Sequence, residues 1–209
     1  MSQVASEVKY LTSENNQSQI KIIVIDEAKL IASVRKIDPY LGSIFDRLGI
    51  LNLLRFKKKP YPALIAAIIG QIITFKQAGL IRKNLYTRFG TDFTHNDMSK
   101  TSDKEFSQMG MNSSMIEKIR SVNRYTQLHH ESSVDDWIQI SGIGQWTIEV
   151  VRLTINPYVD IFPCGDRFLQ NKIWSLYQLA KRPTPKEVKQ ISDKWKGYRG
   201  LVCWYLWRS

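Results

Sequence analysis

Residues 138–149 read Ile-Gln-Ile-Ser-Gly-Ile-Gly-Gln-Trp-Thr-Ile-Glu, an apolar segment broken by the turn Gly142-Ile143-Gly144. Helical apolar spacing resumes at once through Trp146 and Val150. Because glycine adopts positive φ and lets another backbone approach closely, this pattern predicts two helices joined by a very tight hairpin. The amides of the turn, with those that open the second helix, can bind one anion there.

The composition favours a DNA phosphate as that anion. Thirty Lys+Arg against 19 Asp+Glu give a net charge of +11 in 209 residues, which favours a polyanionic partner. A hydrophobic content of 43% indicates a globular protein with a substantial core. The N-terminus has no signal-peptide pattern, and the longest apolar run, residues 63–69, is far too short to cross a membrane. We therefore expect a cytoplasmic protein that joins the nucleoid when bound to DNA and has no membrane partner.

The two cysteines, Cys164 and Cys203, limit the possible cofactors. Two thiols are too few for a disulfide scaffold, a zinc finger or a four-thiolate cluster. We expect a reduced intracellular protein with no iron–sulfur cluster and no catalytic metal.

Helical patterns dominate the rest of the chain. Residues 1–18 are polar and predict a flexible tail, whereas residues 20–25 are β-branched enough for one short strand. Residues 62–75 are apolar on nearly every side, as in a helix at the centre of a helical domain. Ser132 or Ser133, with an Asp three residues on, is a capping signal for the helix that enters the hairpin. The sum is an all-α protein of about ten helices over residues 19–209.

The loop after the hairpin completes a recognisable pattern. Residues 160–166 read Asp-Ile-Phe-Pro-Cys-Gly-Asp, an extended segment that ends in Asp166 at the start of the next helix. The hairpin and this loop together resemble the helix-hairpin-helix (HhH-GPD) DNA glycosylase superfamily. Residues 62–71, 109–118 and 195–207 are similar to landmarks of its 3-methyladenine DNA glycosylase II branch. The resemblance covers about residues 60–207.

This resemblance implies base excision repair of double-stranded DNA that carries a damaged base. It implies two helical lobes with the active-site cleft between them, and a monomer that flips the damaged base without a cofactor. It also implies that a structural Na⁺ or K⁺ can lie at the hairpin, on the carbonyls of Ile138, Ile140 and Gly142. Where better-known members place aromatic residues around the base, this chain has Val150 and Arg167.

Asp166 is the candidate catalytic residue. Breaking an N-glycosidic bond builds positive charge on the deoxyribose, and a carboxylate held against C1′ stabilises that charge and can orient a water molecule. The competing interpretation is that Asp166 only caps the helix that follows, a frequent role for Asp. The hairpin and loop favour catalysis. Asp160 is the second choice, for which a turn or an ion pair is the simpler role.

Trp146 occupies the hairpin position where lyase-competent relatives carry a nucleophilic lysine. Without an amine no Schiff base with the sugar can form there, so the resemblance implies a monofunctional glycosylase that uses water. By the same resemblance Trp146 and Trp207 are two walls of the base pocket, although either can be an ordinary core residue. An aromatic pair suits a cationic alkylated base through cation–π attraction, worth about 0.5–2 kcal/mol per contact.

Contacts with DNA are predicted at the hairpin and after the central helix. The predicted DNA-binding residues are Gly142, Gly144, Gln145, Thr147, Ile148, Gln71 and Ile72. The amides of the two glycines and of Ile148 are expected to hold a phosphate beside the lesion, which positions the protein without reading sequence. By resemblance the last two residues fill the gap that the flipped base leaves, although Ile72 can equally be a core residue.

The sequence therefore predicts a monofunctional DNA glycosylase that excises alkylated purines such as 3-methyladenine. Two alternatives remain at this stage. One is a non-catalytic helix-hairpin-helix DNA-binding protein, which would bind DNA without producing abasic sites. The other is a glycosylase for deaminated or oxidised bases, in which Arg167 hydrogen-bonds a carbonyl edge.

Overall fold

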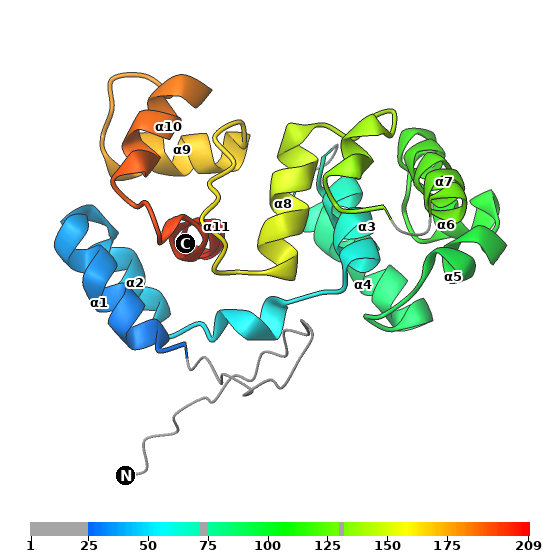
Figure 1. Ribbon diagram of the computed structural model, residues 1–209, viewed down its shortest axis with the longest axis horizontal. Coiled ribbons are helices and arrows are strands. Elements are labelled where there is room, and N and C mark those ends of the chain that lie inside the picture. The colour runs from blue at the N-terminus through cyan, green and yellow to red at the C-terminus, as the bar shows by residue number, and fades with distance from the viewer. Residues whose placement is uncertain (1–24, 72–74, 130–131) are drawn as a thin grey trace, which may run out of the picture.

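The computed structural model describes residues 25–71, 75–129 and 132–209, and within them every regular element is a helix (Figure 1). The α-helices are α1 (Glu27–Ile37), α2 (Gly42–Leu48), α3 (Pro60–Gly70), α4 (Phe75–Phe89), α5 (His95–Lys100), α6 (Asp103–Gln108), α7 (Ser113–Leu128), α8 (Gln145–Ile155), α9 (Arg167–Leu176), α10 (Pro185–Asp193) and α11 (Arg199–Arg208). The short 3-10 helices are η1 (Pro39–Leu41), η2 (Leu53–Phe56) and η3 (Asp136–Gln139). The predicted all-α fold is confirmed. The predicted tail, residues 1–18, and strand, residues 20–25, lie outside the described residues.

The helices form two groups, each around its own hydrophobic core (Figure 1). One group holds α3 to α8, and the other holds α1, α2, α9, α10 and α11. The segment with η2 passes from the second group to the first, and the chain returns after α8. Helix α8 contributes to both cores, because Val151 packs in the first and Leu153 in the second. The helix that follows the hairpin therefore lies at the junction of the two groups.

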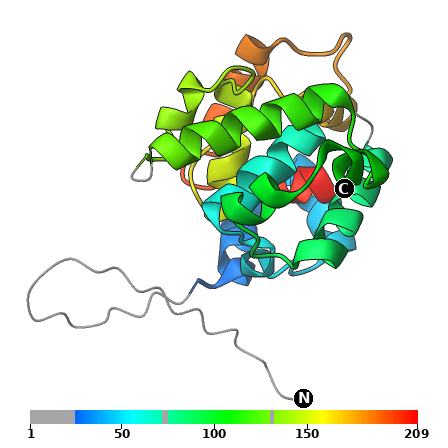
Figure 2. The same cartoon turned by 90° about the vertical axis from the view of Figure 1, so that its right-hand side faces the viewer.

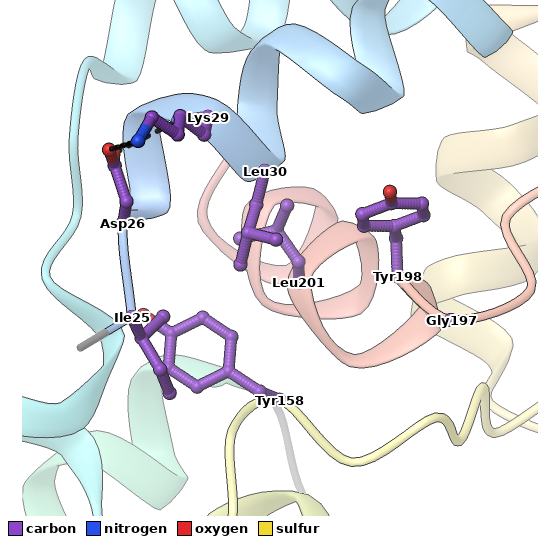
Figure 3. A pocket seen from close by; sticks show the side chains of 8 residues that line it. All are labelled: Ile25, Asp26, Lys29, Leu30, Tyr158, Gly197, Tyr198 and Leu201. Carbon is purple, nitrogen blue, oxygen red and sulfur yellow. Dashed lines mark hydrogen bonds and ion pairs between the residues drawn. The ribbon is translucent and has the colours of Figure 1, made fainter. Parts of the chain in front are cut away.

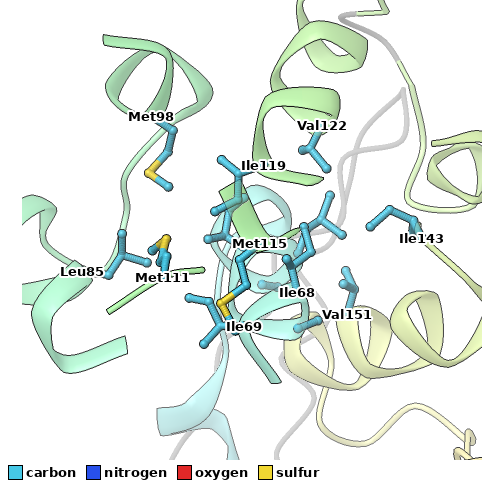
Figure 4. Packing of buried hydrophobic residues seen from close by; sticks show 14 of the residues in the cluster. Ile68, Ile69, Leu85, Met98, Met111, Met115, Ile119, Val122, Ile143 and Val151 are labelled. Carbon is cyan, nitrogen blue, oxygen red and sulfur yellow. The ribbon is translucent and has the colours of Figure 1, made fainter. Parts of the chain in front are cut away.

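Helix α3 is the centre of its group, as its composition predicts. Leu64, Ile65 and Ile68 are fully buried. In Figure 4, Ile68 and Ile69 of α3 lie between Met115 of α7 and Val151 of α8. Seen from the side of α7, that long helix crosses the outer face of the group (Figure 2). Burial on all sides fixes the position of the C-terminal end of α3 beside the hairpin.

The prediction that this central helix extends to residue 75 is wrong. Helix α3 ends at Gly70, and the amide of Gln71 donates to the carbonyl of Ile68 at 3.2 Å, a tightened last turn. Helix α4 begins at Phe75. Because the apolar pattern continues past Gly70, hydrophobic periodicity alone does not locate this end.

The element that enters the hairpin is shorter than predicted. The capping signal is real, since the amide of Ser133 donates to the Asp136 carboxylate at 2.7 Å and the Ser133 hydroxyl accepts from the Asp136 amide at 3.4 Å. It opens only η3, a single 3-10 turn over residues 136–139. Ile140 is already extended at φ −76° and ψ 127°, so the chain turns into the hairpin directly after it.

A pocket of about 350 Å³ lies in the second group, away from the predicted site residues (Figure 3). Its wall is formed by the start of α1, by Tyr158 and by the start of α11. The lining residues are Ile25, Asp26, Lys29, Leu30, Tyr158, Gly197, Tyr198 and Leu201. It is mainly apolar, and none of the residues predicted to bind a base lines it.

Candidate active site

Asp166 is buried at the start of α9, with 7% of its surface exposed. Its Oδ1 accepts from the amide of Leu169 at 3.0 Å, so the carboxylate caps the helix as one interpretation predicts. Its own amide donates to the carbonyl of Pro163 at 2.9 Å, which closes the preceding loop. The cap uses one carboxylate oxygen and fixes the direction of the other.

The second oxygen of Asp166 is bound by Trp146. The indole Nε1 of Trp146 donates to Oδ2 of Asp166 at 3.0 Å. The far end of the same indole reaches the central helix, since a Cβ atom placed on Gly70 would lie 4.0 Å from Cη2 of Trp146. The ring thus spans from the end of α3 to the carboxylate. The structure brings together the two residues on which the predicted reaction type depends.

Trp207 lies on α11, on the same face as Cys203, whose thiol is close to Asp166. Burial, and next the nearby carboxylate of Asp166, raise the pKa of the Cys203 thiol well above its ordinary value. Residues 203 and 207 are one helical turn apart and share a face. Trp207 is half-buried, and its ring packs edge-on against Trp204 with centroids 5.4 Å apart. Its role as a pocket wall stays a prediction that this placement allows.

The two residues that replace family aromatics have different surroundings. Val150 is partly buried against the core of the α3–α8 group. Arg167 is exposed as the first residue of α9, next to Asp166. Its side chain is therefore on the surface, and its membership of the base pocket stays a prediction.

Glu149 is a carboxylate that the sequence analysis did not single out. It is half-buried on α8, one turn after Trp146, and it accepts from Nε2 of Gln145 at 3.1 Å. Burial raises the pKa of Glu149 above its ordinary value. After burial, the carboxylates of Asp166 and Glu149 both raise the pKa of the Cys203 thiol. The sequence signal for Glu149 is its position three residues after Trp146, one helical turn along α8.

Asp160, the second choice for catalysis, has a structural role. Its Oδ2 lies 3.0 Å from Nη1 of Arg199 in an ion pair, and its Oδ1 accepts from the amide of Arg199 at 3.2 Å. Arg199 also pairs with Asp193 at 2.5 Å. These contacts hold the loop after α8 against the start of α11, and they favour the simpler interpretation of Asp160.

Only one of the two hairpin glycines has the positive φ that the sequence predicts. Gly142 has φ +84°, and the amide of Ile143 donates to the carbonyl of Ile140 at 3.0 Å. Gly144 has φ −108°, which other residues also adopt, and it is the N-cap of α8. A Cβ atom on Gly144 would meet nothing within 4 Å. Its surface is therefore open to another molecule.

Two of the predicted DNA contacts need correction. The amide of Ile148 donates to the carbonyl of Gly144 at 3.2 Å inside the first turn of α8, so it is not available to a phosphate. The side chains of Thr147 and Ile148 are buried, at 1% and 3% exposure, because this face of α8 packs on α3. Gly142, Gly144 and Gln145 are exposed as predicted. No acceptor among the described residues binds the amides of Gly144, Gln145 and Trp146.

Gln71 is directed toward the hairpin. Its Nε2 donates to Oγ1 of Thr147 at 2.5 Å and to the carbonyl of Gly142 at 3.4 Å. Its Oε1 accepts from Nζ of Lys118 at 2.7 Å. The side chain thus joins the end of α3 to the hairpin, and the role that was predicted for it between the DNA bases stays a prediction. Ile72 lies outside the described residues.

The carbonyls predicted to hold a monovalent cation are partly used. Ile140 accepts from the amide of Ile143, and Gly142 accepts from Gln71. Each carbonyl keeps a second lone pair, and neutral oxygens suit a hard cation. The chemistry of these carbonyls is therefore compatible with a Na⁺ or K⁺ ion. Among the described residues no three His, Cys, Asp or Glu are grouped to hold a metal ion. No helix in the same residues is long and apolar enough to cross a bilayer.

Comparisons with known proteins agree on one family. The family model described as HhH-GPD superfamily base excision DNA repair protein matches residues 65–197. DNA-3-methyladenine glycosylase 1 of Schizosaccharomyces pombe is 27% identical over 168 residues, which are 73% of each chain. DNA-3-methyladenine glycosylase of Bacillus subtilis is 24% identical over 170 residues, 71% of this chain and 56% of the relative.

Solved structures show the same fold. The 3-methyladenine DNA glycosylase of Schizosaccharomyces pombe in complex with abasic DNA superposes with a TM-score of 0.74, covering 86% of this chain and 95% of that one at 24% identity. The 3-methyladenine DNA glycosylase from Archaeoglobus fulgidus superposes with a TM-score of 0.69 at 18% identity, covering 88% of this chain and 69% of that one.

Proposed function

Since this chain belongs to the HhH-GPD superfamily of base excision DNA repair proteins, we propose that it hydrolyses the N-glycosidic bond of alkylated purines such as 3-methyladenine. The chain is a DNA glycosylase that acts in base excision repair, and its partner is DNA. The observation that carries the proposal is the hydrogen bond between Trp146 and Asp166. It joins the hairpin, which holds DNA in this family, to the carboxylate that would act on the sugar.

Asp166 supplies the charge that the reaction needs. As the glycosidic bond breaks, positive charge spreads over C1′ and the ring oxygen of the deoxyribose, and a fixed carboxylate stabilises it. The Leu169 amide and the Trp146 indole hold both oxygens at 3.0 Å, so little reorientation is required when the sugar arrives. A water molecule beside the carboxylate then attacks C1′.

The absence of a lysine at position 146 determines the product of the reaction. An indole nitrogen cannot form a Schiff base with the sugar, so the product is an abasic site in an unbroken strand. Trp146 and Trp207 would stack on the flipped base, and aromatic faces attract the positive charge of a 3-alkylated purine. The protein acts as a monomer on double-stranded DNA with a damaged base, and the hairpin carbonyls would hold a Na⁺ or K⁺ that reduces phosphate repulsion.

A panel of duplexes, each with one altered base, tests this function. The wild-type protein should release 3-methyladenine and leave strands that break only after hot alkali. Asp166→Asn should slow release by about 100-fold or more, although Asn still caps α9 and the fold is retained. Equal rates for Asp166→Asn and wild type would remove Asp166 from the mechanism. Faster release of hypoxanthine or an oxidised base would change the substrate class, and strand breaks without alkali would indicate lyase activity.

A further inference from the structure

The side chain of Lys118 lies along the hairpin turn. A Cβ atom on Gly142 would be 2.9 Å from Cε, 3.3 Å from Cγ and 3.4 Å from Cδ of Lys118. The aliphatic part of the lysine thus occupies the space that any side chain at position 142 would need. Glycine is favoured here by its φ of +84°, and a side chain at this position would also have to displace the stem of Lys118.

The ammonium group of Lys118 is bound by a neutral acceptor. Its Nζ donates to the neutral Oε1 of Gln71 at 2.7 Å, and no carboxylate of the described residues forms an ion pair with it. An ammonium has three donors, and this contact uses one. Lys118 is half-buried, and its partner Gln71 is in turn fixed to Thr147 and to the Gly142 carbonyl. The charge is therefore held in one place.

This position is unfavourable for a cation in the absence of an anion. The N-terminus of α8 carries a positive partial charge, which disfavours a nearby lysine where an acid would be stabilised. The first amides of α8, those of Gln145 and Trp146, also have no acceptor among the described residues. The ammonium and these amides repel one another until a shared anion binds.

We propose that Lys118 binds the DNA backbone phosphate that the hairpin holds, and that Gln71 positions its ammonium for this contact. The inference rests on the proposed function for the identity of the anion, because a DNA glycosylase presents this hairpin to DNA. The phosphate then receives backbone donors from α8 and one charged donor from α7. Gln71 acts as a positioning residue, because it touches the lysine and the hairpin and not the phosphate.

Salt dependence of DNA binding tests this contact. Each phosphate neutralised by a protein cation adds about 0.9 to the slope of log K against log salt concentration. The variant Lys118→Met retains the aliphatic stem over Gly142, and it should lower this slope by about that amount on damaged and undamaged duplexes alike. Lys118→Arg should restore most of the slope. Lys36→Met, which removes an exposed lysine from α1 in the other group, should leave it unchanged.

The measurement is a fluorescence-anisotropy titration of the full chain with a labelled duplex at four or more KCl concentrations. Melting temperatures of all variants identify any loss of fold. If Lys118→Met is unfolded, the slope measured for Lys118→Arg is used in its place. An unchanged slope for a folded Lys118→Met protein overturns the inference. Base release by wild type is assayed separately. A lower slope without base release by wild type would leave the phosphate contact in place and overturn the proposed function instead.

Discussion

At the scale of single residues, both carboxylate oxygens of Asp166 are hydrogen-bonded, and only one of them is used by the helix cap. It caps α9 through Oδ1 and is bound by Trp146 through Oδ2. The cap therefore does not compete with catalysis, because it fixes the carboxylate that would act on the sugar. Trp146, which is predicted to be a pocket wall, also orients the same carboxylate through its N–H group.

Trp146→Phe separates these two roles, because phenylalanine retains an aromatic face and loses the N–H donor. A hydrogen bond to a charged acceptor is worth about 1.5–3 kcal/mol. We expect single-turnover base release to fall by roughly 10- to 100-fold, while affinity for an abasic-site duplex changes little. Trp174→Phe removes an indole N–H that donates to the Leu179 carbonyl near the C-terminal end of α9, and it is the matched control. A Trp146→Phe rate equal to wild type would leave the indole as a wall only.

At the scale of elements, the hairpin contains two glycines that are required for different reasons. Gly142 has a positive φ and contacts Lys118, whereas Gly144 has an ordinary φ and open space in front of it. The first glycine is needed by the fold. The second leaves open space at the start of α8, where the proposed phosphate would bind.

Gly142→Ala and Gly144→Ala form a matched pair. Alanine at 142 is strained by about 1–2 kcal/mol and must also displace the Lys118 stem, so we expect a lower melting temperature. Alanine at 144 should leave the melting temperature within about 2 °C of wild type. If the hairpin binds a phosphate as proposed, the added methyl group should weaken DNA binding, because it occupies space that is open in front of Gly144. Thermal unfolding and anisotropy titrations of both variants check this. Equal melting temperatures for the two variants would contradict the conformational argument.

The elements also show how much of the fold can be predicted from sequence patterns. The N-cap, proline and glutamate at Thr184, Pro185 and Glu187 predict the start of α10, and the structure has that capping box. The same kind of capping box, with Thr94 and Asp97, begins α5. The end of α3 at Gly70 and the burial of Thr147 depend on packing between helices. The Trp146–Asp166 bond joins residues 20 positions apart, and only the loop between them sets that distance.

At the scale of the whole molecule, buried carboxylates join segments that are far apart in the sequence. Oε1 of Glu27 in α1 accepts from the amide of Leu51 at 2.8 Å and from the hydroxyl of Tyr205 in α11 at 2.8 Å. Its Oε2 accepts from the amide of Leu53 at 3.0 Å and from the hydroxyl of Tyr158 at 2.8 Å. One carboxylate thus fixes α1, the segment leading to the first group, and the helix that carries Trp207.

Glu27 also accepts from the amide of Asn52 at 3.2 Å, so Glu27→Gln replaces an acceptor of five hydrogen bonds by an amide in which only the oxygen can accept. Buried donors without partners then remain, and we expect the free energy of unfolding to fall by at least about 2 kcal/mol. Urea titration followed by tryptophan fluorescence measures this. Glu117→Gln, an exposed change on α7, is the control and should stay within about 0.5 kcal/mol of wild type. A Glu27→Gln midpoint equal to that of the control would show that the network does not hold the groups together.

Asp38 gives the molecule a pH-dependent stability. Its side chain is fully buried between α1 and η1, where desolvation raises the pKa. Hydrogen bonds from Tyr177, Lys194 and Trp195 together exceed that effect, so the pKa of Asp38 is lower in the folded protein than its ordinary value of about 3.9. A lowered folded-state pKa contributes stability above the unfolded value, and that stability is lost as the pH falls through the folded value.

Asp38→Asn should therefore be less stable than wild type at pH 6–7, and the difference should narrow steadily below about pH 4. The Nζ of Lys194, 2.9 Å from Oδ2, and the indole of Trp195, at 2.8 Å, lose a charged acceptor in this variant. Urea midpoints measured from pH 3 to pH 7 provide the test. Asp92→Asn removes an exposed partner of Lys59, a kind of ion pair that is worth little, and its midpoints should run parallel to wild type. Parallel curves for Asp38→Asn and wild type would mean that the protonation of Asp38 is not linked to folding.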